Sequence, residues 1–88
     1  MAEADLTICN QRGLHARAAA KFVKLVGGFE AAVLVSRDGQ EVSGDSIMGL
    51  MMLAAAPGDT ISVQVEGLEE AAAMQAITEL VENKFEEN

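Results

Sequence analysis

The sequence predicts an α+β fold in which helices cover a single face of one β-sheet. The chain has 88 residues, which suffice for one domain, residues 1–88, with one hydrophobic core. Apolar residues alternate with polar ones in some stretches and recur at helical spacing in others, in the order β-α-β-β-α-β-α. Because each expected strand has only one apolar side, all the helices are expected on that side of the sheet.

The first expected strand covers residues 5–9, where apolar and polar side chains alternate. A helix is expected over residues 16–26, because alanine favours helix and apolar residues recur there at helical spacing. Gly27 and Gly28 end this helix, since glycine readily adopts the left-handed conformation of helix C-caps. The side chains expected to be buried are those of Ala19, Phe22, Val23 and Val26.

A β-hairpin is expected after this helix. Residues 29–36 are apolar and rich in valine, which favours a strand, and Asp38-Gly39 is a favourable turn pair. Residues 41–43 then form the short return strand.

A short helix over residues 47–53 follows the hairpin, and Ser46 is expected to cap it. Gly49 weakens this helix by about 1 kcal/mol relative to alanine. The next strand, residues 60–66, shows the clearest alternation in the chain and follows a Pro57-Gly58-Asp59 turn.

The last expected element is a helix over residues 68–85, with one apolar side and glutamates on the other. Its C-terminal end is rich in acidic residues, whose charge opposes the helix dipole, so fraying is expected there. The expected buried side consists of Ala73, Met74, Ile77, Leu80 and Val81.

The charge of the chain argues against several classes of partner. Its formal net charge is −8, and it has no basic stripe of the kind that binds nucleic acid, nor any attraction to anionic membranes. Cys9 is the only cysteine, so no internal disulfide can form and a reducing compartment is expected. With acids at residues 1–5 in place of a secretion signal and no apolar window long enough to cross a bilayer, the expected location is cytoplasmic.

The candidate site is the stretch Gly13-Leu14-His15-Ala16-Arg17, which contains the only histidine. We expect His15 in the first turn of the helix, where backbone N–H groups lack partners and the helix dipole is positive. Arg17 adds a fixed positive charge. Such surroundings favour a neutral imidazole with one ring nitrogen free to attack an electrophile, and a phosphoryl group suits them best. No metal site and no cofactor are expected, because one histidine and one cysteine are too few ligands.

Simpler interpretations stay open for each of these residues. His15 could serve only as a surface or capping residue, Arg17 as a solvated helix charge, and Ser46 as an N-cap. The short helix carries more large apolar side chains than one buried side can accommodate, so some are expected on the surface. Exposed methionines are typical of adaptable protein-binding surfaces, but they also occur at loosely packed core edges.

The two stretches Gly13-Leu14-His15-Ala16-Arg17 and Ser46-Ile47-Met48-Gly49-Leu50-Met51 resemble the phosphohistidine site and the regulatory serine site of the HPr family. HPr is the histidine-containing phosphocarrier of the bacterial phosphoenolpyruvate-dependent phosphotransferase system, and the resemblance covers essentially the whole chain. It implies an open-faced β-sandwich, with four antiparallel strands covered by three helices.

The resemblance also implies roles for single residues. His15 would accept a phosphoryl group at Nδ1 from phosphorylated enzyme I and pass it to an enzyme IIA-type acceptor, so the chain would be a phosphocarrier and not a stand-alone enzyme. Arg17 would steady the phosphate, with the N–H groups of Ala16 and Arg17 as its cradle. Ser46 would be the target of an ATP-dependent HPr kinase where the organism has one. The implied partner surface consists of Ala16, Ala20, Lys24, Ile47, Met48, Met51 and Met52.

One residue departs from the family pattern. The family usually has proline after the arginine, whereas Ala18 follows Arg17 here. This form of the motif, together with the acidic balance, looks closer to the nitrogen-related or regulatory branch than to the sugar-transport branch. The alternative to a phosphocarrier is a small regulatory binding module that acts through its methionine-rich surface without carrying phosphate.

Overall fold

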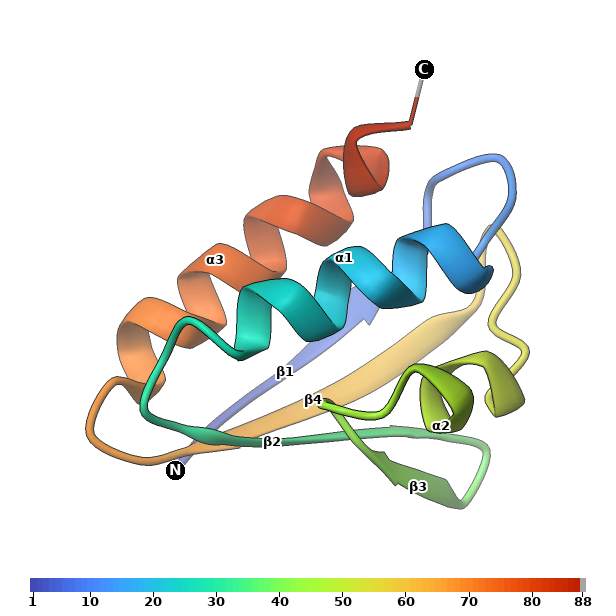
Figure 1. Cartoon of the computed structure of the whole chain (residues 1–88). Coiled ribbons are helices and arrows are strands. Elements are labelled where there is room, and N and C mark those ends of the chain that lie inside the picture. Colours follow the sequence, from blue (N-terminus) through green and yellow to red (C-terminus); the bar gives the residue numbers. More distant parts are fainter. Residues whose placement is uncertain (88) are drawn as a thin grey trace.

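The computed structural model describes residues 1–87 and contains a four-stranded antiparallel sheet in the order β1-β4-β2-β3. Helices α1 and α3 run side by side across one face of the sheet, and α2 lies beside the first half of α1 (Figure 1). The expected fold class is therefore confirmed. The strands are β1 (Ala2–Thr7), β2 (Ala32–Arg37), β3 (Gln40–Ser43) and β4 (Thr60–Glu66), and the helices are α1 (Ala16–Val26), α2 (Ile47–Met52) and α3 (Glu70–Glu82).

Strand β4 lies in the interior of the sheet and pairs with both β1 and β2. Its alternation has the predicted effect, because Ile61, Val63 and Val65 are fully buried beneath the helices. The side chains between them lie on the open face, where the Ser62 hydroxyl donates a hydrogen bond to Asp5 across the strand pair. The sheet thus has one apolar and one polar face, as period-two patterning requires.

Helix α1 has the predicted bounds, and the N–H of its C-cap residue Gly27 donates to the carbonyl oxygen of Val23. The expected left-handed conformation is wrong, because Gly27 has a right-handed φ of −64°. Its buried side differs slightly from the expected one: Ala18 is buried, while Val23 is only partly covered. Helix α1 contacts both α2 and α3.

The bounds of strands β1 and β2 were predicted wrongly. Strand β1 begins at Ala2 and ends at Thr7, because it pairs with β4 from Ala2↔Val65 to Thr7↔Thr60. Cys9 therefore lies beyond the strand and is exposed, with its Sγ 3.3 Å from the carbonyl oxygen of Val81. Strand β2 begins at Ala32, because Phe29 belongs to the turn that ends α1.

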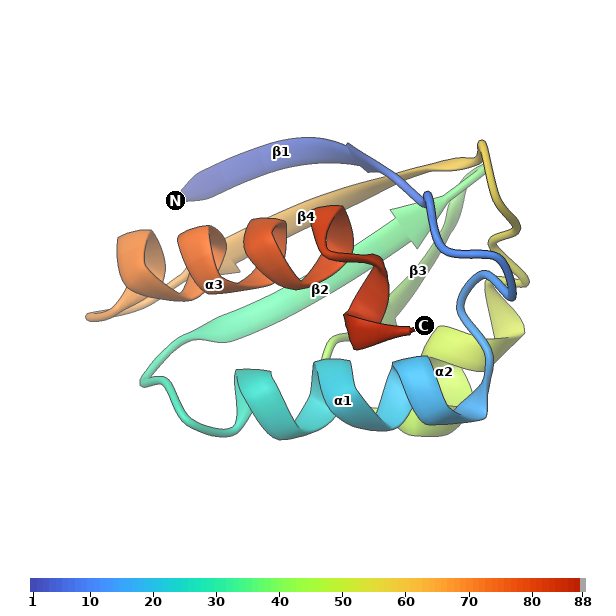
Figure 2. The ribbon, with the colours of Figure 1, turned by 90° about the horizontal axis from the view of Figure 1, so that it is seen from above.

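The end of α3 also differs from the prediction of one frayed helix. The helix ends at Glu82, and a tight turn over Lys84–Glu86 follows, with φ values of 58°, 52° and 60°. The chain does not fray there, because the Phe85 side chain is only 2% exposed and joins the core. This turn bends the chain away from α3 and toward the beginning of α1 (Figure 2).

Candidate functional site

His15 is the N-cap of α1 and therefore lies immediately before the first helical turn. Its carbonyl oxygen accepts the first intrahelical hydrogen bond, from the N–H of Ala19 at 2.8 Å. Its Nδ1 accepts a hydrogen bond from the N–H of Arg17 at 3.3 Å. The imidazole thus occupies the position of a capping side chain, directed at the unpaired N–H groups of the helix.

The loop that carries His15 is fastened to the segment that follows α2. The Leu14 N–H donates to the carbonyl oxygen of Ala55 at 2.9 Å. Gly13 has a φ of +65°, and a Cβ at this position would overlap the same carbonyl oxygen. Glycine is required here both for its backbone conformation and for the close approach of the two chain segments.

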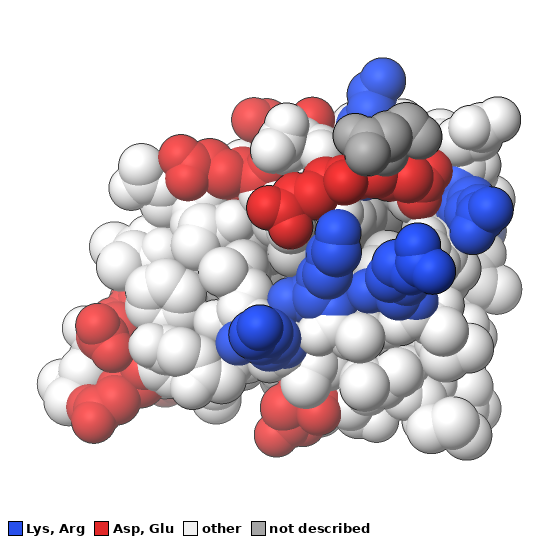
Figure 3. All heavy atoms as spheres, turned by 45° about the horizontal axis from the view of Figure 1, so that its top comes forward, with Lys and Arg blue, Asp and Glu red and all other residues white. Residues whose placement is uncertain are grey.

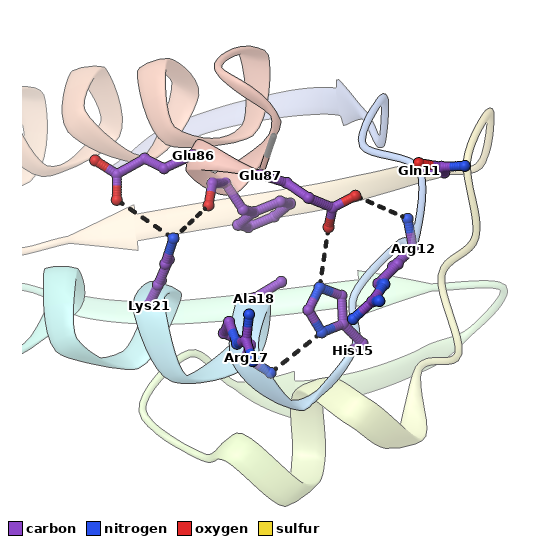
Figure 4. A pocket seen from close by; sticks show the side chains of 9 residues that line it. Gln11, Arg12, His15, Arg17, Ala18, Lys21, Glu86 and Glu87 are labelled. Carbon is purple, nitrogen blue, oxygen red and sulfur yellow. Dashed lines mark hydrogen bonds and ion pairs between the residues drawn. The ribbon is translucent and has the colours of Figure 1, made fainter.

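A shallow pocket of about 300 Å³ opens beside the imidazole. Three basic side chains line it, and a row of basic residues lies on this face next to a band of acidic ones (Figure 3). The close view shows the imidazole between the first turn of α1 and the segment that follows α3 (Figure 4). The pocket is lined by Gln11, Arg12, His15, Arg17, Ala18, Lys21, Phe85, Glu86 and Glu87.

Glu87 contacts the imidazole, and sequence reasoning missed this residue. Its Oε2 lies 3.1 Å from Nε2 of His15 and 3.1 Å from Nδ2 of Asn10, and its Oε1 accepts a hydrogen bond from the Arg12 N–H at 3.2 Å. The Asn10 amide, and to a lesser degree His15 and Arg12, hold the pKa of Glu87 below its ordinary value of 4.5, against an opposing effect of burial. This carboxylate is therefore ionised at neutral pH, and the donors of Asn10 and Arg12 hold it in place beside Nε2 of His15.

Lys21 fastens the segment that presents Glu87. Its Nζ donates to the carbonyl oxygen of Phe85 at 2.9 Å and lies 3.6 Å from Oε1 of Glu86. The turn after α3 is thereby tied to the second turn of α1. No local pattern could reveal this connection, because 64 residues separate Lys21 from Phe85.

The cradle residues lie where the sequence placed them. Arg17 is exposed in the first turn of α1, and within residues 1–87 its guanidinium has no ion-pair partner. Ala16 is also exposed, and both of their N–H groups precede the first intrahelical bond. Ala18 is 1% exposed, so the residue that stands in place of the usual proline is packed in the core.

Ser46 is the N-cap of α2, as predicted, and lies far along the chain from His15. Its Oγ accepts a hydrogen bond from the N–H of Gly49 at 3.0 Å. Gly49 permits close packing on β3, because a Cβ there would lie 3.0 Å from the Cβ of Val42. The capping role predicted for Ser46 is thus present.

The surface of α1 and α2 carries exposed apolar side chains, as predicted from the excess of large residues in α2. Met48 is 72% and Met52 64% exposed, whereas Leu50 is fully buried. All members of the expected partner surface are exposed: Ala16, Ala20, Lys24, Ile47, Met48, Met51 and Met52. The two helices that carry these side chains, α1 and α2, contact each other.

No helix within residues 1–87 combines the length and apolar character that crossing a membrane requires. In the same range, no three His, Cys, Asp or Glu side chains are grouped so that they could bind a metal ion.

The comparisons with known proteins agree with this geometry. The model of a family described as "PTS HPr component phosphorylation site" matches residues 2–83. Phosphocarrier protein HPr of Xylella fastidiosa (strain Temecula1) is 48% identical over 88 residues, covering 100% of this chain and 99% of the relative. Phosphocarrier protein HPr of Cupriavidus necator is 47% identical over 87 residues (99% and 98%), and phosphocarrier protein NPr of Shewanella violacea is 41% identical over 85 residues (97% and 93%).

A solved structure shows the same fold throughout. HPr-C-His of Thermoanaerobacter tengcongensis superposes with a TM-score of 0.94 at 39% sequence identity, covering 100% of this chain and 99% of that one. The family match over residues 2–83, the relatives above 40% identity and this superposition all agree. The chain therefore belongs to the HPr family of the phosphotransferase system, whose members are phosphocarriers and not stand-alone enzymes.

Proposed function

We propose that His15 accepts a phosphoryl group at Nδ1 from phosphorylated enzyme I and passes it to an enzyme IIA-type acceptor. The observation that carries this proposal is the orientation of the ring, whose Nδ1 faces the N–H of Arg17 at the beginning of α1. This is where a helix binds an anion best, because unpaired N–H groups and the positive end of the dipole coincide.

The chemistry requires Nδ1 to have its lone pair available. Its hydrogen bond from the Arg17 N–H is long, at 3.3 Å, so releasing it costs little. As the bond from Nδ1 to phosphorus forms, the bond from phosphorus to the donor atom breaks and its electron pair stays with the donor. The phosphate oxygens then take over the N–H groups of Ala16 and Arg17, with the Arg17 guanidinium as a further cation.

The same face supplies the docking surface in this proposal. The proposed docking surface combines exposed side chains of two helices in contact: Ala16, Ala20 and Lys24 on α1, and Ile47, Met48, Met51 and Met52 on α2. Unbranched methionine side chains adapt to differently shaped partners, which suits a carrier that must meet both a donor and an acceptor. Enzyme I and an enzyme IIA-type protein are the proposed partners.

Ser46 is proposed as a regulatory phosphorylation site for an HPr kinase, where the organism has one. It lies next to Ile47, the first residue of the proposed docking surface on α2. A phosphate on Ser46 would add negative charge beside Asp45 at the edge of that surface.

Incubation with enzyme I and labelled phosphoenolpyruvate tests the carrier function. The wild type is expected to gain an acid-labile phosphate that His15→Ala lacks, and adding candidate IIA proteins should remove it. The choice among acceptors also tests the expected nitrogen-related branch. An unlabelled wild type in the presence of active enzyme I would favour the binding module that acts without carrying phosphate.

A further inference from the structure

The two nitrogens of the His15 ring have partners of opposite kind. Nδ1 faces a backbone N–H, that of Arg17, and so presents its lone pair. Nε2 lies 3.1 Å from a carboxylate oxygen of Glu87, which can only accept, so Nε2 carries the proton when the ring is neutral. The surroundings thus select one of the two neutral tautomers.

We propose that Glu87 is a positioning residue for phosphoryl transfer, anchored by Asn10, which keeps the His15 proton on Nε2 and leaves Nδ1 free to react. This inference rests on the proposed function of His15. Glu87 touches neither phosphorus nor donor; it acts through the ring, as the partner of a reactive or metal-binding histidine does in other sites.

Asn10 holds the Glu87 carboxylate in one position beside the ring. Its side chain is fully buried, and Nδ2 donates both to the carbonyl oxygen of Gly13 at 2.7 Å and to Oε2 of Glu87 at 3.1 Å. Reversing the amide would place Oδ1 against these two acceptors, so its orientation is determined. Oδ1 has no hydrogen-bond partner among the described residues, an unfavourable arrangement that packing alone does not explain.

The turn after α3 supplies the rest of the anchor. Three consecutive positive φ angles at Lys84, Phe85 and Glu86 bend the chain toward α1, and burial of Phe85 holds the bend in place. Figure 4 shows that this turn brings Glu87 to the side of the imidazole opposite the Arg17 N–H. The carboxylate therefore approaches the ring without standing on the path to Nδ1.

The same contact serves the transfer step. When Nδ1 forms its bond to phosphorus, the ring keeps the Nε2 proton and becomes cationic. The Glu87 carboxylate then pairs with that positive charge across an existing hydrogen bond, with no proton to be moved. When the group leaves for the acceptor, the electron pair of the nitrogen–phosphorus bond returns to Nδ1 and the ring is neutral again.

Two matched variants of the full chain test this inference. Glu87→Ala removes the carboxylate beside His15, while Glu82→Ala removes the same charge from an exposed side chain at the end of α3, outside the pocket lining. Glu87→Ala is expected to slow phosphorylation by enzyme I about tenfold, the lower end of what losing a histidine's supporting partner costs. Glu82→Ala should keep the wild-type rate.

A second measurement does not depend on enzyme I. In ¹⁵N spectra of the neutral His15 ring, the wild type and Glu82→Ala should show the proton on Nε2, and Glu87→Ala should show a new population protonated at Nδ1. Equal rates for the two variants, or an unchanged tautomer in Glu87→Ala, would overturn the role of Glu87. Failure of the wild type to accept phosphate would instead overturn the carrier function on which it rests.

Discussion

The Nζ of Lys21 on α1 lies 2.9 Å from the carbonyl oxygen of Phe85, in the turn that follows α3. A charged donor on one helix thus ties down the end of another. We expect Lys21→Ala to lower the free energy of unfolding by about 1 kcal/mol, the size of one such hydrogen bond. Urea unfolding measures this, with Lys24→Ala on the exposed side of the same helix as control. Equal losses in both variants would contradict the fastening role of Lys21.

Gly13 is expected to tolerate no side chain. Gly13→Ala forces a left-handed conformation, which costs about 1–2 kcal/mol, and it drives a methyl group into the carbonyl oxygen of Ala55. Gly39→Ala is the matched control, because Gly39 also has a positive φ, +81°, but has open space around its Cα. Thermal unfolding should show a clearly larger loss for Gly13→Ala; equal losses would mean that the close approach to Ala55 is unimportant.

Arg17 is expected to matter for transfer and not for folding. Its guanidinium is exposed and beside the proposed phosphate position, so Arg17→Gln should slow phosphorylation by enzyme I on the order of tenfold or more. The unfolding free energy of Arg17→Gln should stay near that of the wild type. Lys84→Gln removes a positive charge from an exposed residue outside the pocket lining and should leave the rate unchanged. Similar slowing in both variants would indicate a general effect of net charge.

Ser46→Asp is expected to slow phosphorylation of His15 by enzyme I. The new charge lies at the beginning of α2, where it adds to that of Asp45 and has to be desolvated when a partner covers the proposed docking surface. Ser46→Ala separates charge from capping: it should lose about 1 kcal/mol of stability with the hydrogen bond to Gly49 and keep its phosphorylation rate. An unchanged rate in Ser46→Asp would exclude this route of regulation.

The contact of Glu87 predicts a pH-dependent contribution to stability. Asn10, His15 and Arg12 lower the pKa of Glu87 in the folded protein below 4.5, so across this window the unfolded chain binds more protons. The stabilisation is complete above about pH 4.5 and is lost as pH falls through the folded-state pKa. Chemical unfolding of wild type and Glu87→Ala should therefore differ most at neutral pH and converge in acid. A difference that is constant from pH 7 to pH 3 would refute the assignment.

Local patterns predicted the parts of this fold that depend on local forces. The bounds of α1 and β4, the Asp38-Gly39 turn and the Ser46 cap all follow from propensity, alternation and capping chemistry. The start of β1 could not be predicted, because it depends on pairing with β4 along its full length.

The sequence predicted the site in the same way: its local residues could be placed, and those brought in from distant parts of the chain could not. His15 and Arg17 lie within one short stretch, so the sequence placed them together at the beginning of a helix. Glu87 lies 72 residues from His15, and its approach depends on a left-handed turn at non-glycine residues that no local signal indicates. Acidic residues near a helix end predicted fraying, whereas the structure pairs Glu86 with Lys21 and Glu87 with His15.

His15 lies at the beginning of α1, the helix that contacts α2, and the chain has no other histidine. A protein that docks there to reach the imidazole would exclude a second protein. The phosphoryl donor and the acceptor would therefore have to bind one after the other. The residence time of each complex would then limit the rate of phosphoryl transfer through the carrier. A weak complex that dissociates quickly would therefore serve the carrier better than a tight one.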